Sequence, residues 1–493
     1  MHILFASSEA APFAKTGGLG DVGGALPRAL AELGCEVTLI LPSYKAVRNG
    51  RFEIRPLDIE FEITIGDKTV KASLEEATLP DSSVRVVLVR QDDYFDRNGL
   101  YAEGTDDYPD NSERFIFFCR AVIEAGKALG RPVDVLHAND WQTGLLPALL
   151  QVKGRKHPVF ENAVSVMTIH NLAFQGIFWH FDMKLTGLDW EYFNYHQMEY
   201  YGRLNLLKTG ISFCDALTTV SPRYSQEIQT EHFGHGLDSL MRHRSDRLAG
   251  ILNGIDIDVW NPETDPDLVA NYSAENALDG KAACKAELQR TLGLEEDPNA
   301  IIIGAVGRLT YQKGADWLAD LIPAWCETSS VQWVVLGTGD PQIERPLREA
   351  SRAHPNRAAV RLEFSEQLAH KIYAGSDLFC MPSRFEPCGL SQLNSLRYGT
   401  APIVRCVGGL ADTVVDTNEK TLAVETANGF CFADECSESL DATIRRAIET
   451  FQDPEIRRRL IDNGMRLDYS WSKSAQQYVV LYEEAIQRRK NEG

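Results

Sequence analysis

The chain has 493 residues with a formal net charge of -20, and 44% of its residues are hydrophobic while 24% are charged. This length is too great for one ordinary hydrophobic core and favours two or three domains. The negative charge argues against nucleic acids and anionic membranes as partners, because both are bound through clustered lysine and arginine side chains.

The first half of the chain alternates short apolar runs with helical stretches. The runs lie at His2–Ala6, Glu36–Leu41, Val84–Val89, Val133–His137, Val164–His170 and Ala216–Val220. Alternation of this kind predicts a parallel sheet. Between the second and third runs, the segment from Ile59 to Leu79 alternates apolar and polar residues around Gly66-Asp67. This pattern indicates an antiparallel hairpin added to the sheet.

A glycine-rich loop, Lys15-Thr16-Gly17-Gly18-Leu19-Gly20-Asp21, closely follows the first predicted strand. Its glycines let backbone N–H groups approach an anion, a helix that begins near Asp21 points its positive end the same way, and Lys15 adds a full charge. The sequence therefore predicts a phosphate site here. The spacing fits neither the Walker pattern nor the dinucleotide fingerprint, so a simple tight connection stays an alternative.

Two histidines lie at the ends of predicted strands. His137 is followed by Asn139-Asp140, and His170 ends the next strand. Ligands of open α/β sheets bind outside the carboxyl ends of the strands, so both are candidates for a site. A neutral imidazole satisfied by backbone groups is the structural alternative, and it is stronger for His137 than for His170. No histidine pair has the spacing of a helical metal site.

The ten cysteines are scattered without the Cys-x-x-Cys spacing of a metal site, and several lie within apolar stretches. We therefore expect neither disulfides nor a zinc site. No apolar run reaches the roughly 18 residues of a membrane span, and the first predicted strand begins almost at Met1 without a leader-like segment. These features favour a cytoplasmic location.

The alternation restarts in the second half after a polar linker that contains Asn253-Gly254-Ile255-Asp256 and Asn261–Asp267. The later apolar runs lie at Ala300–Val306, Val331–Leu336, Asp377–Met381 and Pro402–Arg405. Two α/β domains with a cleft between them are predicted. Near the end, apolar residues at helical spacing predict a closing amphipathic helix. These residues are Tyr478, Leu481, Tyr482, Ala485 and Ile486.

The segment from Gly307 to Gly314 directly follows a predicted buried strand and carries Arg308 and Lys313. Two cations at a strand-to-helix turn are suited to clamping a diphosphate, with arginine as a bidentate fork and lysine as a point charge. A solvated helix start is the alternative. Because cations at a helix N-terminus oppose the macrodipole, a bound anion explains them better.

Two more polar segments follow later strands. In the segment Pro382–Leu390, the carboxylate of Glu386 can cap backbone N–H groups or accept hydrogen bonds from sugar hydroxyls. Downstream, Val407-Gly408-Gly409 repeats the glycine-loop pattern of residues 17–20. We expect the two glycine loops and the two cations to meet across one cleft.

Four of these segments together resemble the motifs of bacterial glycogen synthases and plant starch synthases. They are Lys15–Asp21, Asn253–Asp256, Gly307–Gly314 and Ser383–Leu390, and they occur in the family's order along the whole chain. The resemblance implies an α/β protein of the GT-B fold with two Rossmann-like domains, residues 1–252 on the glucan side and 253–470 on the donor side. A last helix, 471–493, would pack back on the first domain.

The same resemblance implies a reaction and its participants. Glucose would pass from ADP-glucose to the non-reducing end of an α-1,4-glucan such as glycogen, with retention of configuration and without a metal ion or other cofactor. Four residues would be catalytic. Arg308 and Lys313 would stabilise the leaving diphosphate, His170 would hydrogen-bond the transferred glucose, and Glu386 would bind its hydroxyls.

The resemblance also implies a set of residues that bind substrate. They are Lys15, Gly17, Gly18, Asp21, Asn253, Phe364, Cys388, Gly389, Leu390, Gly408 and Gly409. Two positions depart from the family pattern. Phe364 stands where a tyrosine is frequent in the nucleotide pocket, so stacking survives and a hydroxyl contact does not. Val407 replaces a threonine, which removes a side-chain contact but leaves the backbone donors.

Several other functions compete with this interpretation. A related GT-B enzyme would use UDP-glucose or another acceptor, and a catalytically silent relative would only bind glucan. The retained diphosphate clamp disfavours a silent binder, because a neutral glucan has no use for it. A phosphorylase would need a pyridoxal-phosphate lysine in a longer chain, and an NAD oxidoreductase would need the missing dinucleotide fingerprint.

Overall fold

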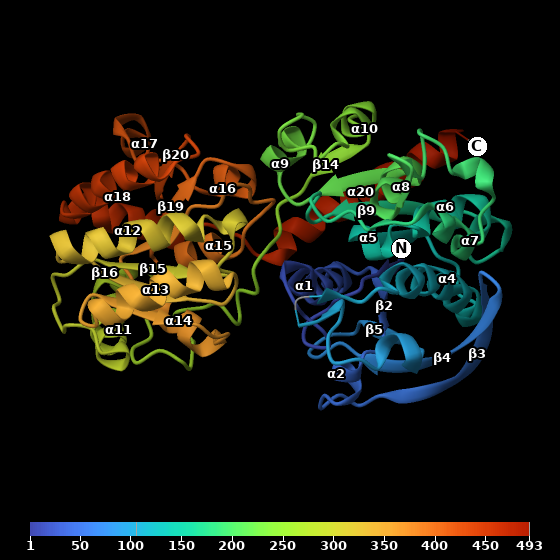
Figure 1. Cartoon of the computed structure of the whole chain (residues 1–493), viewed down its shortest axis with the longest axis horizontal. Coiled ribbons are helices and arrows are strands. Elements are labelled where there is room, and N and C mark those ends of the chain that lie inside the picture. Colours follow the sequence, from blue (N-terminus) through green and yellow to red (C-terminus); the bar gives the residue numbers. More distant parts are fainter. Residues whose placement is uncertain (105, 493) are drawn as a thin grey trace. The chain divides into compact units, whose positions relative to one another are not determined.

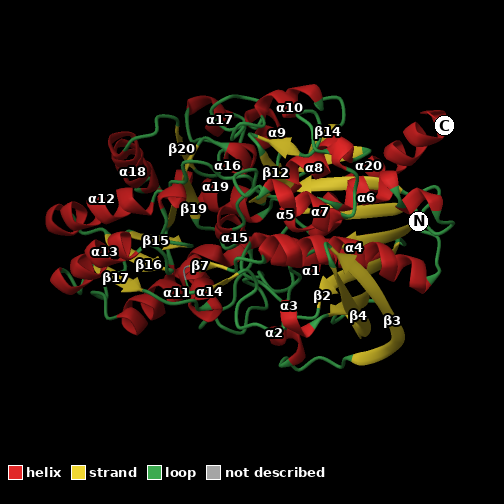
Figure 2. Ribbon diagram, turned by 45° about the vertical axis from the view of Figure 1, so that its right-hand side comes forward, coloured by secondary structure: helices red, strands yellow, loops and turns green. Residues whose placement is uncertain are grey.

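The computed structural model describes residues 1–104 and 106–492, which form two compact units (Figure 1). The first unit comprises Met1–Val220, Ser225–Asn253 and Trp471–Gly493, and the second comprises Ser221–Tyr224 and Gly254–Ser470. Asn253, the first residue of the predicted second domain, thus belongs to the first unit. Each unit is built on its own sheet flanked by helices (Figure 2), so the predicted α/β class is confirmed.

The first unit has a nine-stranded sheet in the order β14-β13-β9-β8-β1-β2-β5-β4-β3. Its parallel strands are β1 (His2–Ala6), β2 (Glu36–Pro42), β5 (Arg85–Arg90), β8 (Val135–Asn139), β9 (Val164–Ile169), β13 (Ala216–Thr219) and β14 (Leu248–Gly250). The sequence predicted all of these strands except β14. β1 is buried along its whole length, as expected of a central strand covered on both faces.

The predicted hairpin is confirmed as β3 (Arg55–Ile65) and β4 (Lys68–Thr78), which pair antiparallel and extend the sheet beyond β5. Figure 2 shows this long, curved hairpin at one edge of the sheet. Shorter strands of the unit are β6 (Ala102–Glu103), β7 (Asp106–Asp107), β10 (Ile177–Phe178), β11 (Glu199–Tyr200) and β12 (Arg203–Asn205). The last three form a small separate sheet.

Helices cover the first sheet and end with the C-terminal helix of the chain. They are α1 (Gly18–Glu32), α2 (Lys45–Arg48), α3 (Asp92–Phe95), α4 (Asn111–Leu129), α5 (Asp140–Thr143), α6 (Leu146–Val152), α7 (Met183–Thr186), α8 (Leu206–Phe213), α10 (Asp238–His243) and α20 (Trp471–Glu492). α9 (Pro222–Glu227) contains one of the places where the chain passes from one unit to the other, between Tyr224 and Ser225. α20 contacts α1 and β9 and buries Tyr478 and Tyr482, so the predicted docking of the last helix on the first domain is confirmed.

The second unit has a six-stranded, wholly parallel sheet in the order β17-β16-β15-β18-β19-β20. The strands are β15 (Ile302–Val306), β16 (Gln332–Leu336), β17 (Ala358–Arg361), β18 (Leu378–Met381), β19 (Ala401–Arg405) and β20 (Phe430–Phe432). Numbered from the first strand of the unit, this is the doubly wound order 3-2-1-4-5-6. The order reverses between β15 and β18. The parallel part of the first sheet reverses in the same way between β1 and β8.

Nine helices of the described residues surround the second sheet. They are α11 (Ala277–Leu292), α12 (Ala315–Thr328), α13 (Pro341–Ala353), α14 (Glu366–Gly375), α15 (Ser391–Arg397), α16 (Gly408–Thr413), α17 (Glu419–Ala423), α18 (Ser437–Phe451) and α19 (Pro454–Met465). The core contains Trp333, Ile303 and Ile403 from the strands, packed with side chains of α12, α13 and α18. This core fixes the strand ends that carry the polar loops.

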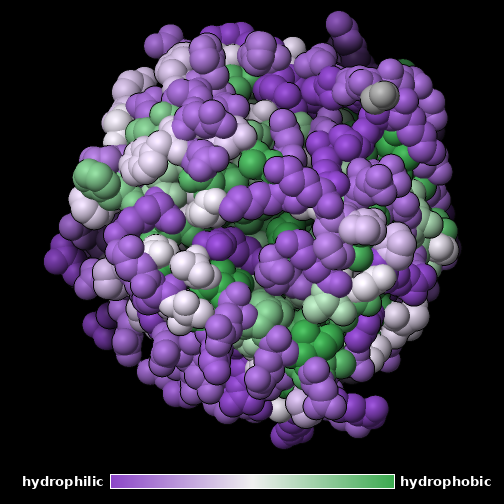
Figure 3. Space-filling model, turned by 90° about the vertical axis from the view of Figure 1, so that its right-hand side faces the viewer, coloured by the Kyte–Doolittle hydropathy of each residue, from purple (hydrophilic) through white to green (hydrophobic). Residues whose placement is uncertain are grey.

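None of the ten cysteines, all of which lie within the described residues, forms a disulfide. In the described part of the chain, no helix combines the length and the apolar character that a membrane crossing requires. The face of the molecule in Figure 3 is mainly hydrophilic and carries separate hydrophobic areas.

Candidate functional site

The loops that follow β15 and β18 meet at the reversal point of the second sheet. Gly314 has φ 66°, and a Cβ atom there would lie 2.3 Å from the carbonyl oxygen of Pro382. Only glycine allows this close approach. The backbone N–H of Arg384 donates to the carbonyl of Gln312 at 2.8 Å, which ties the two loops together. The structure thus brings together two segments that the sequence analysis treated as separate motifs.

An ion pair joins the two main candidates of these loops. Lys313 Nζ lies 2.5 Å from Glu386 Oε2, and Ser383 Oγ donates to the same oxygen at 3.0 Å. The Glu386 side chain is buried and Lys313 is partly buried. A buried carboxylate with two donors holds the lysine in one position, so the positive charge of Lys313 is fixed at the reversal point.

Arg308 lies on the same loop as Lys313 but is exposed. Within residues 1–104 and 106–492, its guanidinium has neither an ion-pair partner nor a hydrogen-bond acceptor. Five N–H donors at the reversal point are therefore available to an anion. One cation of this loop is fixed by a carboxylate, and the other is free to bind.

Arg384 supports the cation loop, a role that the sequence analysis did not assign to it. Its guanidinium makes a bidentate contact with Asp316, at 2.6 and 2.7 Å, and lies 3.5 Å from the centre of the Tyr311 ring and 4.0 Å from that of Trp317. Arg384 itself is buried. The only sequence signal was a basic residue in the segment after a predicted strand, since its acidic partner is 68 positions away.

The loop after β19 packs directly on the Glu386 loop. Gly408 has φ 43°, and a Cβ atom there would lie 1.9 Å from the carbonyl oxygen of Glu386. At Gly409, a Cβ atom would lie 2.1 Å from the carbonyl oxygen of Cys388, and the Gly409 N–H donates to the Glu386 carbonyl at 3.1 Å. The two glycines are therefore required for this contact. They bring the third predicted motif of the second unit to the other two.

The remaining candidates of the second unit differ in their surroundings. Gly389 has φ 75°, Cys388 is buried and Leu390 is partly buried, all on the Glu386 loop. Phe364 lies between β17 and α14 and is 84% exposed. Among the described residues, no hydrogen bond or ring contact joins Phe364 to the three loops. Its ring is thus open to a stacking partner.

In the first unit, a buried carboxylate organises the glycine-rich loop. Glu9 accepts hydrogen bonds from Thr16 N at 2.5 Å, Thr16 Oγ1 at 2.7 Å, Gly17 N at 3.3 Å and Tyr101 OH at 2.8 Å. The Gly17 N–H therefore donates to Glu9 in this structure. The sequence analysis had expected this N–H to be open to an anion. Glu9 was not among the residues predicted from the sequence, although an acidic residue three positions after the end of an apolar strand was a visible signal.

The glycine-rich loop leads into α1, whose N-terminal residue is Gly18. Lys15 Nζ lies 2.6 Å from Asp21 Oδ1, and both side chains are partly exposed. Cβ atoms at Gly23 and Gly24 would lie 2.2 Å from the carbonyl oxygens of Glu9 and Ala11. These glycines let the first turns of α1 lie directly on the Glu9 segment, which fixes the position of Lys15.

His170, at the end of β9, contacts the end of β8. The backbone N–H of His170 donates to Asp140 Oδ1 at 2.7 Å, and the ring Nε2 lies 2.9 Å from Asn139 Oδ1. Burial lowers the pKa of His170 to about 3, so the imidazole is neutral. Burial raises the pKa of Asp140 to about 7, against hydrogen bonds from two backbone N–H groups that lower it. Asp140 is thus a positioning partner of His170, a role that the sequence did not indicate.

His137 is a neutral histidine whose two ring nitrogens are satisfied within the protein, which was the alternative to a role in the site. It is fully buried, its Nδ1 lies 2.8 Å from Tyr482 OH and its Nε2 lies 2.7 Å from Thr168 Oγ1. Burial lowers its pKa to about 3.

Asn253 is also buried, and its Oδ1 lacks a hydrogen-bond partner among the described residues. Such an orphaned acceptor is typical of a site that binds a ligand or water.

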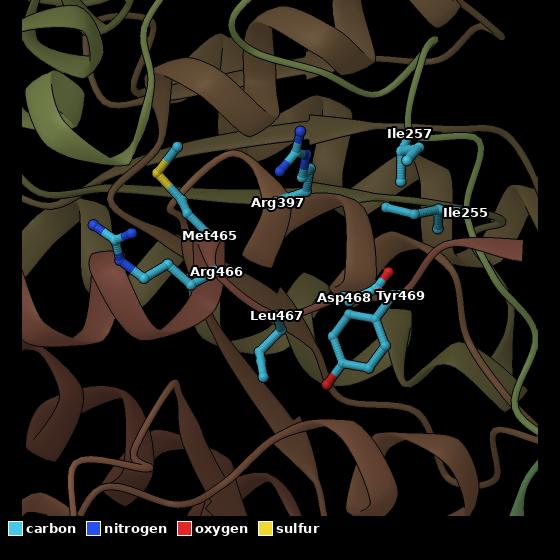
Figure 4. A pocket seen from close by; sticks show the side chains of 8 residues that line it. All are labelled: Ile255, Ile257, Arg397, Met465, Arg466, Leu467, Asp468 and Tyr469. Carbon is cyan, nitrogen blue, oxygen red and sulfur yellow. The ribbon is translucent and has the colours of Figure 1, made fainter. Parts of the chain in front are cut away.

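Two other features of the second unit lie outside these loops. A pocket of about 370 Å³ includes Ile255, Arg397, Arg466 and Tyr469 in its lining (Figure 4). Arg466 contacts Asp462 and Glu275, so its charge is already compensated. The lining contains none of the predicted site residues.

A group formed by Asp265, Asp267 and His370 has the proximity of metal ligands. However, Asp265 Oδ2 accepts from both His370 Nδ1 at 2.6 Å and Tyr398 OH at 2.5 Å, and Trp260 stacks on the His370 ring. These contacts satisfy the carboxylate and the imidazole within the protein. The cluster is therefore explained as a polar contact between α14, Tyr398 directly after α15, and the polar linker.

Comparison with known proteins agrees with this arrangement. Residues 2–243 match the family model described as "Starch synthase catalytic domain", and residues 286–466 match "Glycosyl transferases group 1". The chain is 43% identical to a glycogen synthase of Rhodopirellula baltica over all of both chains. It is 46% identical to one of Anaeromyxobacter sp. strain Fw109-5, covering 98% of this chain and 99% of the other.

A solved structure supports the same relationship. The catalytic domain of starch synthase IV from Arabidopsis thaliana, bound to ADP and acarbose, matches with a TM-score of 0.91 and 34% identity over 99% of both chains. A sucrose-phosphate synthase matches at 18% identity with a TM-score of 0.59, which shows a shared fold alone. The chain belongs to the glycogen synthase and starch synthase family of glycosyltransferases.

Proposed function

We propose that the chain transfers glucose from ADP-glucose to the non-reducing end of an α-1,4-glucan, with retention of configuration. The observation that carries the proposal is the arrangement of Arg308, Lys313 and Glu386 at the reversal point of the second sheet. Family membership and the related starch synthase with bound ADP support the choice of donor. We also propose a cytoplasmic location, which agrees with ten cysteines that form no disulfide in the described residues.

The two cations act on the leaving group. As the bond between the glucose C1 and the diphosphate oxygen breaks, negative charge grows on the diphosphate. Lys313, fixed by Glu386, and the exposed Arg308 both stabilise this charge, so they lower the barrier more than they strengthen binding of the intact donor. The acceptor 4-hydroxyl forms the new bond to C1, and its proton passes to the departing diphosphate. Neither a metal ion nor another cofactor takes part in this proposal.

Glu386 has two roles in this proposal. Its Oε2 accepts hydrogen bonds from Lys313 Nζ and Ser383 Oγ, while Oε1 has no hydrogen-bond partner among the described residues. We assign Oε1 to a hydroxyl of the transferred glucose. A carboxylate that already pairs with a lysine is a weak nucleophile, which favours attack of the acceptor from the face that the diphosphate leaves. The backbone of Cys388, Gly389 and Leu390 lies on the same loop and contacts the sugar.

Residues of the first unit complete the proposed set. The Nε2 of His170 donates to Asn139, so Nδ1 of the neutral imidazole is left to accept a hydrogen bond from a sugar hydroxyl. Lys15 and Gly18 contact the diphosphate from the glycine-rich loop. Asp21 positions Lys15, and the unpartnered Oδ1 of Asn253 accepts from a substrate hydroxyl. Gly408 and Gly409 support the Glu386 loop, and Phe364 stacks on the adenine.

A transfer assay tests the proposed donor and product. Glycogen is incubated with labelled ADP-glucose or labelled UDP-glucose, in the presence of a chelator, and the product is digested with an exo-acting α-1,4-glucan hydrolase. We expect label from ADP-glucose that the hydrolase releases as maltose. A clear preference for UDP-glucose would assign the chain to another donor class. Transfer from neither donor, with glycogen still bound, would identify a silent glucan-binding protein.

A further inference from the structure

A pocket of the second unit is lined by residues that the proposed reaction does not use. It has a volume of about 370 Å³ and lies beside the segment from residue 465 to 469, where the chain leaves α19 (Figure 4). Its lining includes the cation Arg397, the apolar side chains of Ile255, Ile257 and Leu467, and the polar Asp468 and Tyr469. All six residues belong to the second unit. The volume is sufficient for a small organic molecule.

Arg397 brings a positive charge without a carboxylate partner to this pocket. It is the last residue of α15 and is partly buried. Within residues 1–104 and 106–492, its guanidinium has one hydrogen-bond acceptor, Asn261 Oδ1 at 3.1 Å, and no ion-pair partner. Its Nε is buried without any acceptor among these residues. Because an unpaired buried donor costs free energy, a guanidinium in this state favours an anionic ligand.

The other charged side chains of the lining restrict the charge of that ligand. Arg466 pairs with Asp462 at 2.7 Å and with Glu275 at 3.2 Å, and it points away from Arg397 (Figure 4). Asp468 is exposed, and its Oδ1 accepts from the Ser470 N–H at 2.9 Å. A ligand with several negative charges would be repelled by this carboxylate. The electrostatics therefore favour a single negative charge, placed on Arg397.

The apolar part of the lining favours a ligand with an apolar body. Ile257 is 42% exposed and Leu467 is 40% exposed, although both are large apolar side chains. Exposed apolar area in a concave site, next to a few polar groups, is typical of small-molecule sites. A carboxylate matches the fork of N–H donors of an arginine. The lining therefore fits a molecule with one carboxylate and a short hydrocarbon body.

The walls of the pocket are held by hydrogen bonds. The Ile255 N–H donates to the Tyr469 carbonyl at 2.8 Å, which places the two wall segments side by side. Tyr469 OH donates to the Thr413 carbonyl at 3.1 Å. Burial raises the pKa of this phenol to about 12, so it stays neutral. Walls that are already fixed lose little conformational freedom when a ligand binds.

We propose that this pocket binds a small amphipathic monocarboxylate, with the carboxylate on Arg397 and the hydrocarbon body against Ile257 and Leu467. The proposal concerns a second ligand of the chain and does not depend on the proposed function. A failure of glucose transfer would therefore leave it unaffected, and its own failure would leave the proposed function unaffected.

Three probes of the same length separate charge from hydrophobicity. Binding of hexanoate, hexanol and hexylamine to the full chain is measured by saturation-transfer NMR titration. Hexanol lacks the charge and hexylamine reverses it. The hexanoate series is repeated with saturating ADP, which would displace a probe from the proposed donor site. Thermal unfolding of each variant shows that it is folded.

We expect the wild type to bind hexanoate at least about tenfold more tightly than hexanol or hexylamine, because a charge-assisted hydrogen bond is lost with both. Arg397→Gln should weaken hexanoate about tenfold and leave hexanol unchanged. Arg397→Lys keeps the charge without the fork and should have an intermediate affinity. Arg466→Gln makes the same change of net charge at a compensated arginine of the same pocket, and it should alter the affinity less than about twofold.

A second variant tests the apolar wall and does not depend on the folding of the Arg397 variants. Ile257→Ala should weaken hexanoate at least about threefold and leave acetate, which has no hydrocarbon body, unchanged. Four results would overturn the proposal. They are no binding of hexanoate to the wild type, equal affinity for the three probes, equal loss in Arg397→Gln and Arg466→Gln, and displacement of hexanoate by ADP.

Discussion

Lys313 Nζ and Glu386 Oε2 lie 2.5 Å apart although the two residues are separated by 73 positions in the chain. The ion pair joins the loop after β15 to the loop after β18, where the order of the second sheet reverses. Because Ser383 donates to the same oxygen, the carboxylate orients the lysine and not the reverse. Substitution of either partner therefore changes the electrostatics of the proposed diphosphate site.

Glu386→Gln tests whether the charge of this carboxylate is needed. The amide keeps the size of the side chain but no longer fixes the Lys313 ammonium, so we expect kcat to fall about 10²-fold. Binding of ADP, measured by calorimetry, should change little because Arg308 and Lys313 remain. Ser383→Ala is the milder control, since it removes one hydrogen bond to the same oxygen. Equal kcat values for the wild type and Glu386→Gln would show that the pair is only structural.

Glu9→Gln tests the support of the glycine-rich loop. Glu9 receives four hydrogen bonds, and an amide NH₂ group in its place would face donors of Thr16 and Gly17. We expect a displaced loop and a loss of at least about tenfold in kcat/KM for the donor, with the thermal midpoint lowered. Glu32→Gln, an exposed carboxylate at the end of α1, is the matched control. If Glu9→Gln were as active as this control, Glu9 would not be needed for the proposed donor site.

Tyr482→Phe tests the docking of the last helix on the first unit. The substitution leaves His137 Nδ1 without its partner at a fully buried position, which costs about 1–3 kcal/mol of stability. We expect a lower midpoint for the first unit in thermal unfolding and unchanged transfer activity well below that midpoint. Val480→Ala, on the exposed side of the same helix, should leave the midpoint unchanged. Equal midpoints for both variants would contradict a stabilising contact.

Asp140→Asn tests the pH dependence of stability. The pKa of Asp140 is raised from 3.8 to about 7 by burial, so the folded chain holds this proton more tightly than the unfolded chain does. The contribution of Asp140 is thus fully present below about pH 4 and is lost as the pH rises through 7. We expect the thermal midpoint of the wild type to fall more between pH 5 and pH 8 than that of the variant.

Asparagine suits this test because residue 140 has φ 55°, a conformation that asparagine tolerates. Its side-chain oxygen can still accept from the His170 N–H. The difference between the two midpoint curves therefore reports on the proton and not on backbone strain. Parallel curves would mean that Asp140 stays ionised throughout this pH range.

Most of the fold was predictable because buried parallel strands are continuous apolar runs, as in β1, β9 and β16. The missed strands lack that signal. β17 ends in Arg361, and β14 and β20 have three residues each. Hydrophobic periodicity carries too little information at such lengths.

The residues that we propose for the site could be named from the sequence, because glycines and charged side chains follow the strand ends, but their pairings could not. Arg384 pairs with Asp316, 68 positions away, and Glu9 accepts a hydrogen bond from Tyr101, 92 positions away. Such pairs depend on which strands are neighbours and which loops meet at the reversal point. A single sequence does not contain that information, and so Glu9 and Arg384 were found only in the structure.

The most direct test of the central proposal is the initial rate of glucose transfer from labelled ADP-glucose to glycogen, measured for the wild type, Lys313→Ala and Lys420→Ala. Lys420 is an exposed lysine of the same unit and serves as the control. We expect ready transfer by the wild type and the control, and a loss of about 10²- to 10³-fold in Lys313→Ala. Equal rates in all three proteins, or no transfer by the wild type, would contradict the assignment.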